Sequence, residues 1–440
     1  MSNQEKLAIL GGEKSVTKRS SAMRAPEIAP RAYETVKSLM DKNEISTSPI
    51  VSEFEARFSQ YIGVKYGLCV CNGTTSIQAG LFAVGVKPGD EVIVPSFTFW
   101  ASAGPIIALG AIPKFADVDL QTHNVLAESI EKQITPKTRA IIVVHVWGNP
   151  CDMDAIMAVA RKHSIKVVED CSHAHGATYK GKKVGSFGDV GCFSMQGSKV
   201  LSAGEGGILV TDRRECYERA VAMGHYERCK GLGEESEYSR YSMTGFGFKH
   251  RIHPLAVAIA DANLYLMDEL NEARYQNGKR LEELLSDLDY VKVQKEYDGA
   301  KRVFAYHYVR YVPEALKGLK LKTLLLALKA EGVNCGSCGY GKLHLSPLYT
   351  RDGIFAKDYP FVREEYPTDL AESDLPNTAV LASNAFMLVG RLEICTDDDL
   401  QAYSKAYHKI VENLDDLLAY EKAQSIDGEI KNDGRSINYV

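Results

Sequence analysis

The sequence of 440 residues lacks the features of several large classes of protein. It has no apolar run of the roughly 18 to 20 residues that a membrane span requires, and residues 1–20 are polar, without the apolar core of a signal peptide. Basic residues do not exceed acidic ones: 52 Lys and Arg face 57 Asp and Glu, for a net charge of -5. The chain therefore offers no basic surface for nucleic acid. These absences predict a cytoplasmic protein that acts on neither membranes nor nucleic acids.

The ten cysteines show no disulfide rhythm. Most are expected to be small buried hydrophobic residues in a cytosolic chain of this size. Cys335-Gly336-Ser337-Cys338 is the one CxxC motif, and it has neither a second pair at metal-ligand spacing nor thioredoxin-like surroundings. We therefore expect these two cysteines to be structural and predict no metal site.

Short apolar segments alternate with amphipathic ones over the first half of the chain. Such alternation is typical of an α/β sandwich with a mainly parallel central sheet. Strands are expected at 68–70, 91–94, 114–118, 140–146, 165–168, 190–194 and 208–211, with helices at 76–84, 101–109 and 153–163.

A long helical pattern from Ile252 to Leu285 leads out of this region into a smaller C-terminal α+β domain. There we expect a strand at 306–311 and helices at 321–331 and 398–417. The predicted organisation is an N-terminal extension (1–25), a large cofactor-binding domain (26–260), a small domain (261–423) and a polar tail (424–440).

Two residues in the large domain point to a particular chemistry. The strand expected at 165–168 runs into Glu169-Asp170. Lys199 lies on a loop after a later strand, before the glycines at 204, 206 and 207. Ligands of such sheets bind beyond the strand ends. Alone, Asp170 could cap a helix and Lys199 could be a solvated lysine. Together they suit pyridoxal 5'-phosphate, whose aldehyde forms a Schiff base with lysine while a carboxylate keeps its pyridine nitrogen protonated.

Other motifs support that interpretation only in combination with this pair. The segment 71–76, Cys-Asn-Gly-Thr-Thr-Ser, would place backbone amides of a helix N-terminus around a phosphate. Taken alone, it is better explained as an ordinary N-cap, and only together with Asp170 and Lys199 does it favour a phosphate site. Phe99 could stack on a pyridine ring or belong to the core. His173, three residues after Asp170, could contact the cofactor or be structural.

The segment from Val167 to Ala177 resembles the cofactor segment of the DegT-type sugar aminotransferases, a branch of the fold-type I pyridoxal phosphate enzymes. The resemblance continues in register through 182–189, Phe193-Ser194, Lys199 and 204–207, and extends over about 26–417. It implies a large domain and a smaller C-terminal domain of the fold-type I aminotransferase kind.

The resemblance also implies roles for individual residues. Lys199 and Asp170 would be catalytic, Phe99 would stack on the cofactor ring, and His173 stands where many members have Gln. The cofactor's phosphate would be held by Gly73, Thr74, Thr75 and Ser194. Family members form homodimers with shared active sites, so Arg251 or Lys249 could reach the partner's phosphate.

The activity implied is transfer of an amino group from glutamate or glutamine to a keto-sugar, nucleotide-linked or phosphorylated, or to a keto-cyclitol. Candidate acceptor contacts are His344, Tyr340 and Trp147, with His145 beside the last. One alternative is a sugar dehydratase of the same fold, but those enzymes carry His in place of the lysine. The other is a non-catalytic cofactor-binding regulator, which an intact lysine, acid and phosphate loop disfavour.

Overall fold

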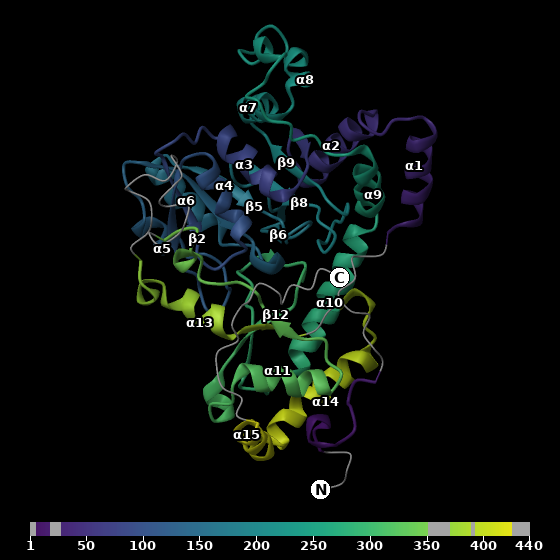
Figure 1. Ribbon diagram of the computed structural model, residues 1–440, viewed down its shortest axis with the longest axis vertical. Helices are drawn as coiled ribbons and strands as arrows, with labels where there is room; N and C mark the ends of the chain where they lie inside the picture. Colours follow the sequence, from purple (N-terminus) through teal and green to yellow (C-terminus); the bar gives the residue numbers. More distant parts are fainter. Residues whose placement is uncertain (1–5, 18–27, 351–369, 389–391, 425–440) are drawn as a thin grey trace.

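The computed structural model describes residues 6–17, 28–350, 370–388 and 392–424 (Figure 1). Its centre is a seven-stranded sheet in the order β1-β9-β8-β5-β4-β2-β3, in which β9 runs antiparallel to all the other strands. The strands are β1 (Tyr66–Val70), β2 (Glu91–Pro95), β3 (Ile112–Ala116), β4 (Thr138–Val144), β5 (Lys166–Asp170), β8 (Val190–Ser194) and β9 (Gly207–Thr211). The predicted α/β class with a mainly parallel sheet is confirmed.

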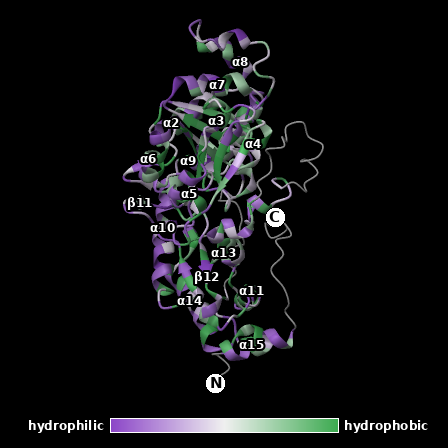
Figure 2. Ribbon diagram, turned by 90° about the vertical axis from the view of Figure 1, so that its left-hand side faces the viewer, coloured by the Kyte–Doolittle hydropathy of each residue, from purple (hydrophilic) through white to green (hydrophobic). Residues whose placement is uncertain are grey.

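Helices cover both faces of this sheet, as a buried parallel sheet requires. One face packs against α3 (Gly73–Ala83), α4 (Gly104–Ala108) and α7 (Arg214–Gly224). The other packs against α2 (Pro49–Ile62), α5 (Ala127–Lys132), α6 (Met153–His163) and α9 (Pro254–Leu264). The hydropathy view shows the resulting apolar interior between polar outer surfaces (Figure 2). Further elements of this half are α1 (Pro30–Asp41), α8 (Tyr226–Cys229), β6 (Thr178–Tyr179), β7 (Lys182–Lys183) and β11 (Ala300–Lys301).

Helix α10 (Met267–Leu284) connects the central sheet to a second, antiparallel sheet in the lower half of Figure 1. Its order is β10-β12-β14-β13. The elements here are β10 (Val291–Val293), β12 (Tyr308–Tyr311), α11 (Leu321–Ala330), β13 (Gly336–Ser337), α13 (Pro376–Asn384), β14 (Ala385–Met387), α14 (Asp397–Glu412) and α15 (Leu414–Ala423). Leu7 and Val16 join the apolar core of this half, whereas α1 packs against α9 in the other half.

Three predicted helices are interrupted. The expected helix at 101–109 is a short 3-10 turn (Trp100–Ser102) followed by α4, because Pro105 fixes a new N-terminus. The pattern after Ile252 breaks at Tyr265, and the last helix breaks at Asn413. The domain boundaries remain a prediction, and the proposed tail beyond 424 lies outside the described residues. Among the residues described, no helix combines the length and apolarity needed to span a bilayer.

A buried ion pair fixes the N-terminal segment to the second half. Lys409 on α14 donates to both carboxylate oxygens of Glu331 at 2.8 Å, and the same carboxylate accepts the amides of Ala8 and Ser15. Although burial opposes the charge of Glu331, the hydrogen bonds from Lys409 and from the backbone of Ala8 outweigh it and lower the pKa.

Removing the lysine of this pair should be strongly destabilising. We expect Lys409→Met to lower the free energy of unfolding by about 3–5 kcal/mol, because it leaves a buried carboxylate without its countercharge. Lys405→Met, at an exposed position of the same helix, is the matched control and should change stability little. Urea denaturation measures both, and equal effects of the two variants would contradict the assignment.

Candidate active site

Asp170 ends β5 at the carboxyl edge of the central sheet, where ligands of parallel sheets bind. Its side chain is buried. One carboxylate oxygen accepts the hydroxyl of Ser102 at 2.7 Å, and the other accepts the amide and hydroxyl of Ser172 at 3.1 and 2.6 Å. Three donors thus orient a carboxylate that has about four acceptor positions. The remaining position can accept one further N–H group.

Lys199 lies on the loop that follows β8, half-buried at the same edge of the sheet. Its amide donates to the carbonyl of Gln196 at 2.8 Å, and its Nζ lies 5.9 Å from the ring centroid of Tyr306. Within the described residues it has no carboxylate partner. The Tyr306 ring in turn contacts the ring of His173, with centroids 5.4 Å apart. The structure therefore brings Lys199 and His173 to one place, and the amine is available for chemistry.

The N-terminus of α3 carries the segment that the sequence predicts to bind phosphate. Asn72 caps the helix by accepting the amide of Thr75 at 2.8 Å, which leaves the amides of Gly73 and Thr74 without an acceptor in the described part of the chain. A Cβ on Gly73 would lie 2.5 Å from the Cβ of Ser194, so only glycine permits this approach of helix to strand. Free amides beside a serine hydroxyl are the donors that a phosphate group requires. The site therefore fits the phosphate of the expected cofactor.

His173 is held in one tautomer by its neighbours. Its Nδ1 accepts the amide of Trp147 at 3.3 Å, so the ring proton is on Nε2, which lies 3.3 Å from the hydroxyl of Tyr340. Burial, reinforced by the positive charge of Lys199, holds the pKa of His173 well below its usual range. The residue is therefore a neutral hydrogen-bonding group at physiological pH.

Aromatic side chains extend from His173 towards the second sheet. Trp147 stacks on Tyr308 at a centroid distance of 4.3 Å and on Tyr340 at 5.8 Å. Phe99 is half-buried, with its ring centroid 6.4 Å from that of Tyr340. Two of the three candidate acceptor contacts, Trp147 and Tyr340, thus lie together beside His173. The motifs did not reveal Ser102, Tyr306 and Tyr308, because their roles depend on packing between distant segments.

The remaining predicted residues lie elsewhere. His344 is buried with its Nδ1 at 2.6 Å from the hydroxyl of Ser96, and its ring contacts Phe115. Lys249 is exposed beside the ring of Tyr226. The Nε of Arg251 lies 3.9 Å from Oε1 of Glu227. Arg251 also lines a cavity of about 370 Å³, whose wall includes the first turn of α2. Within one subunit, these contacts do not bring His344, Lys249 or Arg251 to Lys199.

The two CxxC cysteines are buried, and their thiols donate to backbone carbonyls of Leu325 and Tyr340. Burial raises the pKa of both Cys335 and Cys338 to about 12. A thiolate is the form that binds metal or attacks disulfides, so both residues are suited to a structural role.

A second buried histidine near Lys199 should make stability depend on pH. Burial and the charge of Lys199 lower the pKa of His175 to about 3. Below pH 6.5 the unfolded chain therefore binds one more proton than the folded chain, and stability falls as the pH is lowered. We expect His175→Phe to remove about 3 kcal/mol of the loss between pH 6.5 and 4. Urea midpoints at several pH values measure this, and an unchanged acid slope would contradict it.

Comparison with known proteins agrees with this geometry. Residues 26–388 match the DegT/DnrJ/EryC1/StrS aminotransferase family. The chain is similar to the L-glutamine:2-deoxy-scyllo-inosose aminotransferase of Streptomyces fradiae, with 35% identity over 74% of this chain and 78% of the relative.

Solved structures show the same similarity. An aminotransferase from Psychrobacter cryohalolentis superimposes with a TM-score of 0.78 at 27% identity, covering 89% of this chain and 99% of the other. DesI, solved with its TDP-sugar product, superimposes with a TM-score of 0.77 at 28% identity, covering 95% of this chain and 99% of DesI. The resemblance found in the sequence is confirmed. The chain belongs to the DegT/DnrJ/EryC1/StrS aminotransferase family and is an aminotransferase.

Proposed function

We propose that this aminotransferase uses pyridoxal 5'-phosphate to move an amino group from glutamine or glutamate to a keto-cyclitol. The observation that carries the proposal is the pairing of an amine without a carboxylate partner, Lys199, with a buried, oriented carboxylate, Asp170, at one edge of the sheet. That arrangement is what this cofactor requires of a protein.

The side chains have separate tasks in this proposal. Gly73 and Thr74 would bind the phosphate through their amides. Asp170 would accept a hydrogen bond from the protonated ring nitrogen at its remaining acceptor position. When bound, the cofactor supplies an electron sink that stabilises negative charge at the substrate carbon. Lys199 Nζ would take the proton from the α-carbon of the donor as a base and would then deliver it to the cofactor as an acid. Since donor and acceptor use the site in turn, ping-pong kinetics follow.

The family relatives support a polyhydroxylated ketone as the acceptor. The name of the S. fradiae relative specifies glutamine and a deoxy-inosose, which is a keto-cyclitol. A nucleotide-linked keto-sugar is the second candidate, because DesI was solved with a TDP-sugar product. The aromatic surface of Trp147 and Tyr340 beside the neutral His173 could contact the apolar face and the hydroxyl groups of either ring.

A two-step assay tests the donor and the acceptor separately. The cofactor-loaded protein is first mixed with glutamine or glutamate, and the loss of its visible absorbance is followed. After removal of the donor, keto-cyclitols and nucleotide-linked keto-sugars are added, and recovery of the absorbance is measured. We expect recovery with keto-cyclitols at the higher kcat/KM. No change with either donor would contradict the proposal, whereas recovery only with nucleotide-linked sugars would favour the second candidate.

We also propose a cytoplasmic homodimer in which Arg251 contributes to the site of the partner. The segment after α8 projects from the top of Figure 1 and exposes apolar side chains, among them Met243 and Phe246, with exposed fractions of 86% and 60%. Exposed apolar patches of this kind mark association surfaces. Light scattering should give a mass near twice 48.5 kDa, and a monomer would contradict the shared site.

A further inference from the structure

Glu169 precedes Asp170 on β5, and its side chain lies on the opposite face of the sheet because strand residues alternate. It is fully buried. Its carboxylate accepts four hydrogen bonds: the amides of Gly185, Phe187 and Gly188, each at 2.7 Å, and His145 Nε2 at 3.1 Å. All of its acceptor positions are therefore filled.

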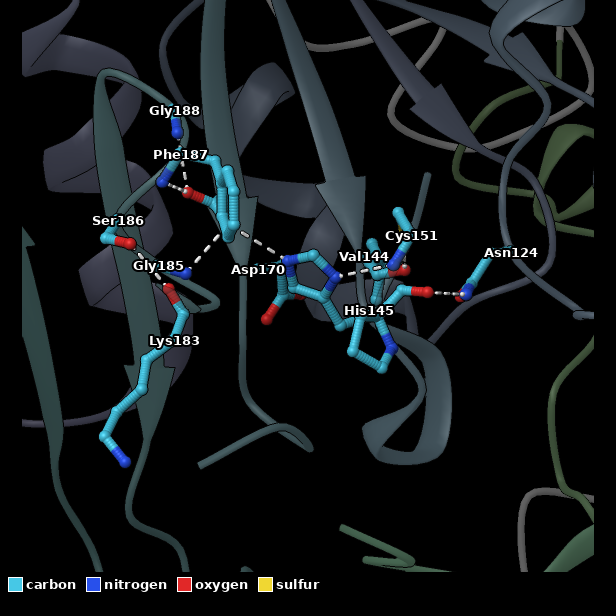
Figure 3. Close-up of polar contacts among 12 residues, drawn as sticks. Asn124, Val144, His145, Cys151, Asp170, Lys183, Gly185, Ser186, Phe187 and Gly188 are labelled. Atoms are coloured by element: carbon cyan, nitrogen blue, oxygen red, sulfur yellow. Dashed lines mark hydrogen bonds and ion pairs between the residues drawn. The ribbon is translucent and has the colours of Figure 1, made fainter. Parts of the chain in front are cut away.

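The ring of His145 connects this carboxylate to the loop that follows β4. Its Nδ1 accepts the amide of Cys151 at 3.0 Å, so Nε2 carries the proton and donates to Glu169. The His145 amide donates to the carbonyl of Asp170 at 3.2 Å. Figure 3 shows the ring between Cys151 and β5. His145, Glu169 and Cys171 lie close enough to hold a metal ion, but the first two have no lone pair left for one.

The loop held by His145 carries Trp147 in a strained conformation. Trp147 has φ 56° and ψ 19°, in the left-handed region that is unfavourable for a residue with a side chain. Such a conformation persists only where its surroundings fix it. Asn124 accepts the amide of Val146 at 3.1 Å, and the amide of Gly148 donates to the carbonyl of His145 at 3.1 Å. The Trp147 amide then reaches His173.

We propose that Glu169 and His145 form a brace that positions Trp147, and through it His173, beside Lys199. Neither residue of the brace touches the reacting groups. They act by fixing the loop at 145–151 against β5, so both are positioning residues. The importance of the brace for catalysis rests on the proposed function, whereas its effect on Trp147 does not.

The two tryptophans of the chain make the brace measurable without cofactor. Trp100 is exposed and Trp147 is buried, so in a Trp100→Phe background the fluorescence reports Trp147 alone. His145→Gln keeps an amide N–H near the position of Nε2 that can still donate to Glu169, and it loses only the acceptor for the Cys151 amide. His145→Asn reaches only as far as Nδ1 and loses that bond. We expect His145→Asn to increase quenching of Trp147 by acrylamide severalfold, and His145→Gln to leave it near the parent value.

Asp189→Asn is the control for a general loss of stability. Asp189 is a buried carboxylate near the opposite end of β5, where it accepts the amide of Val167 at 2.9 Å and pairs with Lys166 and Arg213. The Asp189→Asn variant should have a lower free energy of unfolding without exposing Trp147. Should His145→Asn fail to fold, Glu169→Gln in the same background tests the carboxylate of the brace and should expose Trp147, because its NH2 group must face N–H donors either at His145 and Gly185 or at Phe187 and Gly188.

Activity supplies an independent comparison. We expect kcat/KM to fall about 10- to 100-fold in His145→Asn, since small misplacements at a reacting site have effects of this size, with recovery in His145→Gln. The proposal is overturned if acrylamide quenches Trp147 equally in His145→Asn and His145→Gln. It is also overturned if Asp189→Asn exposes Trp147 as much as His145→Asn does. A correct quenching pattern in a protein without transaminase activity would refute the proposed function and leave the brace standing.

Discussion

Lys199→Ala should lower the rate of amino transfer by roughly 10⁴-fold or more. The lysine has two tasks in the proposed reaction, covalent attachment of the cofactor and movement of the proton, and no second amine among the described contacts lies beside His173 to replace it. The variant should still bind the cofactor non-covalently, because the phosphate loop and Asp170 are unchanged. Steady-state kinetics with glutamine measure the loss.

Lys183→Ala is the matched control for this variant. Lys183 is also half-buried and lies over the ring of Tyr61 at 3.9 Å, in a segment that the family resemblance includes. Its removal should change the rate little. If Lys183→Ala inactivated the enzyme and Lys199→Ala did not, the assignment of the catalytic lysine would be wrong.

Asp170→Asn should lower kcat by roughly 10³-fold, as expected when a charge that stabilises the transition state is lost. Asparagine retains one acceptor oxygen for Ser102 or Ser172, so the loop should keep its shape. What it cannot do is neutralise a protonated ring nitrogen. The electron sink is weakened although the cofactor still binds.

Kinetics and binding together distinguish this effect from simple unfolding. The apparent affinity for pyridoxal 5'-phosphate and the midpoint of thermal unfolding should change far less than kcat. Asp189→Asn again serves as the control, because this carboxylate contacts the opposite end of β5. Full activity of Asp170→Asn would show that the ring nitrogen needs no charged partner and would contradict the mechanism.

Much of the candidate site could be predicted because it is local in sequence. The predicted phosphate segment, Asp170 and Lys199 each lie at or just after the end of a different strand. Parallel strands bring their carboxyl ends to one edge of the sheet. Tyr306 and Tyr340 reach His173 from the second half of the chain. No periodicity encodes such a contact.

The brace was likewise hidden from the sequence. His145 and Glu169 are 24 residues apart, and their contact depends on the pairing of β4 with β5. The left-handed backbone of Trp147 could not be anticipated, since a large side chain disfavours it. The helix interruptions at Tyr265 and Asn413 were missed because the apolar helical pattern of the sequence continues across both breaks.

Borohydride reduction of the cofactor-loaded protein, followed by peptide mass analysis, identifies the lysine that binds the cofactor. Reduction makes a bond between lysine and cofactor permanent and so marks the residue that carries it. We expect one modified peptide, which contains Lys199, and loss of that modification when glutamine is added before the reductant. A label on another lysine, or no label on any peptide, would contradict this expectation.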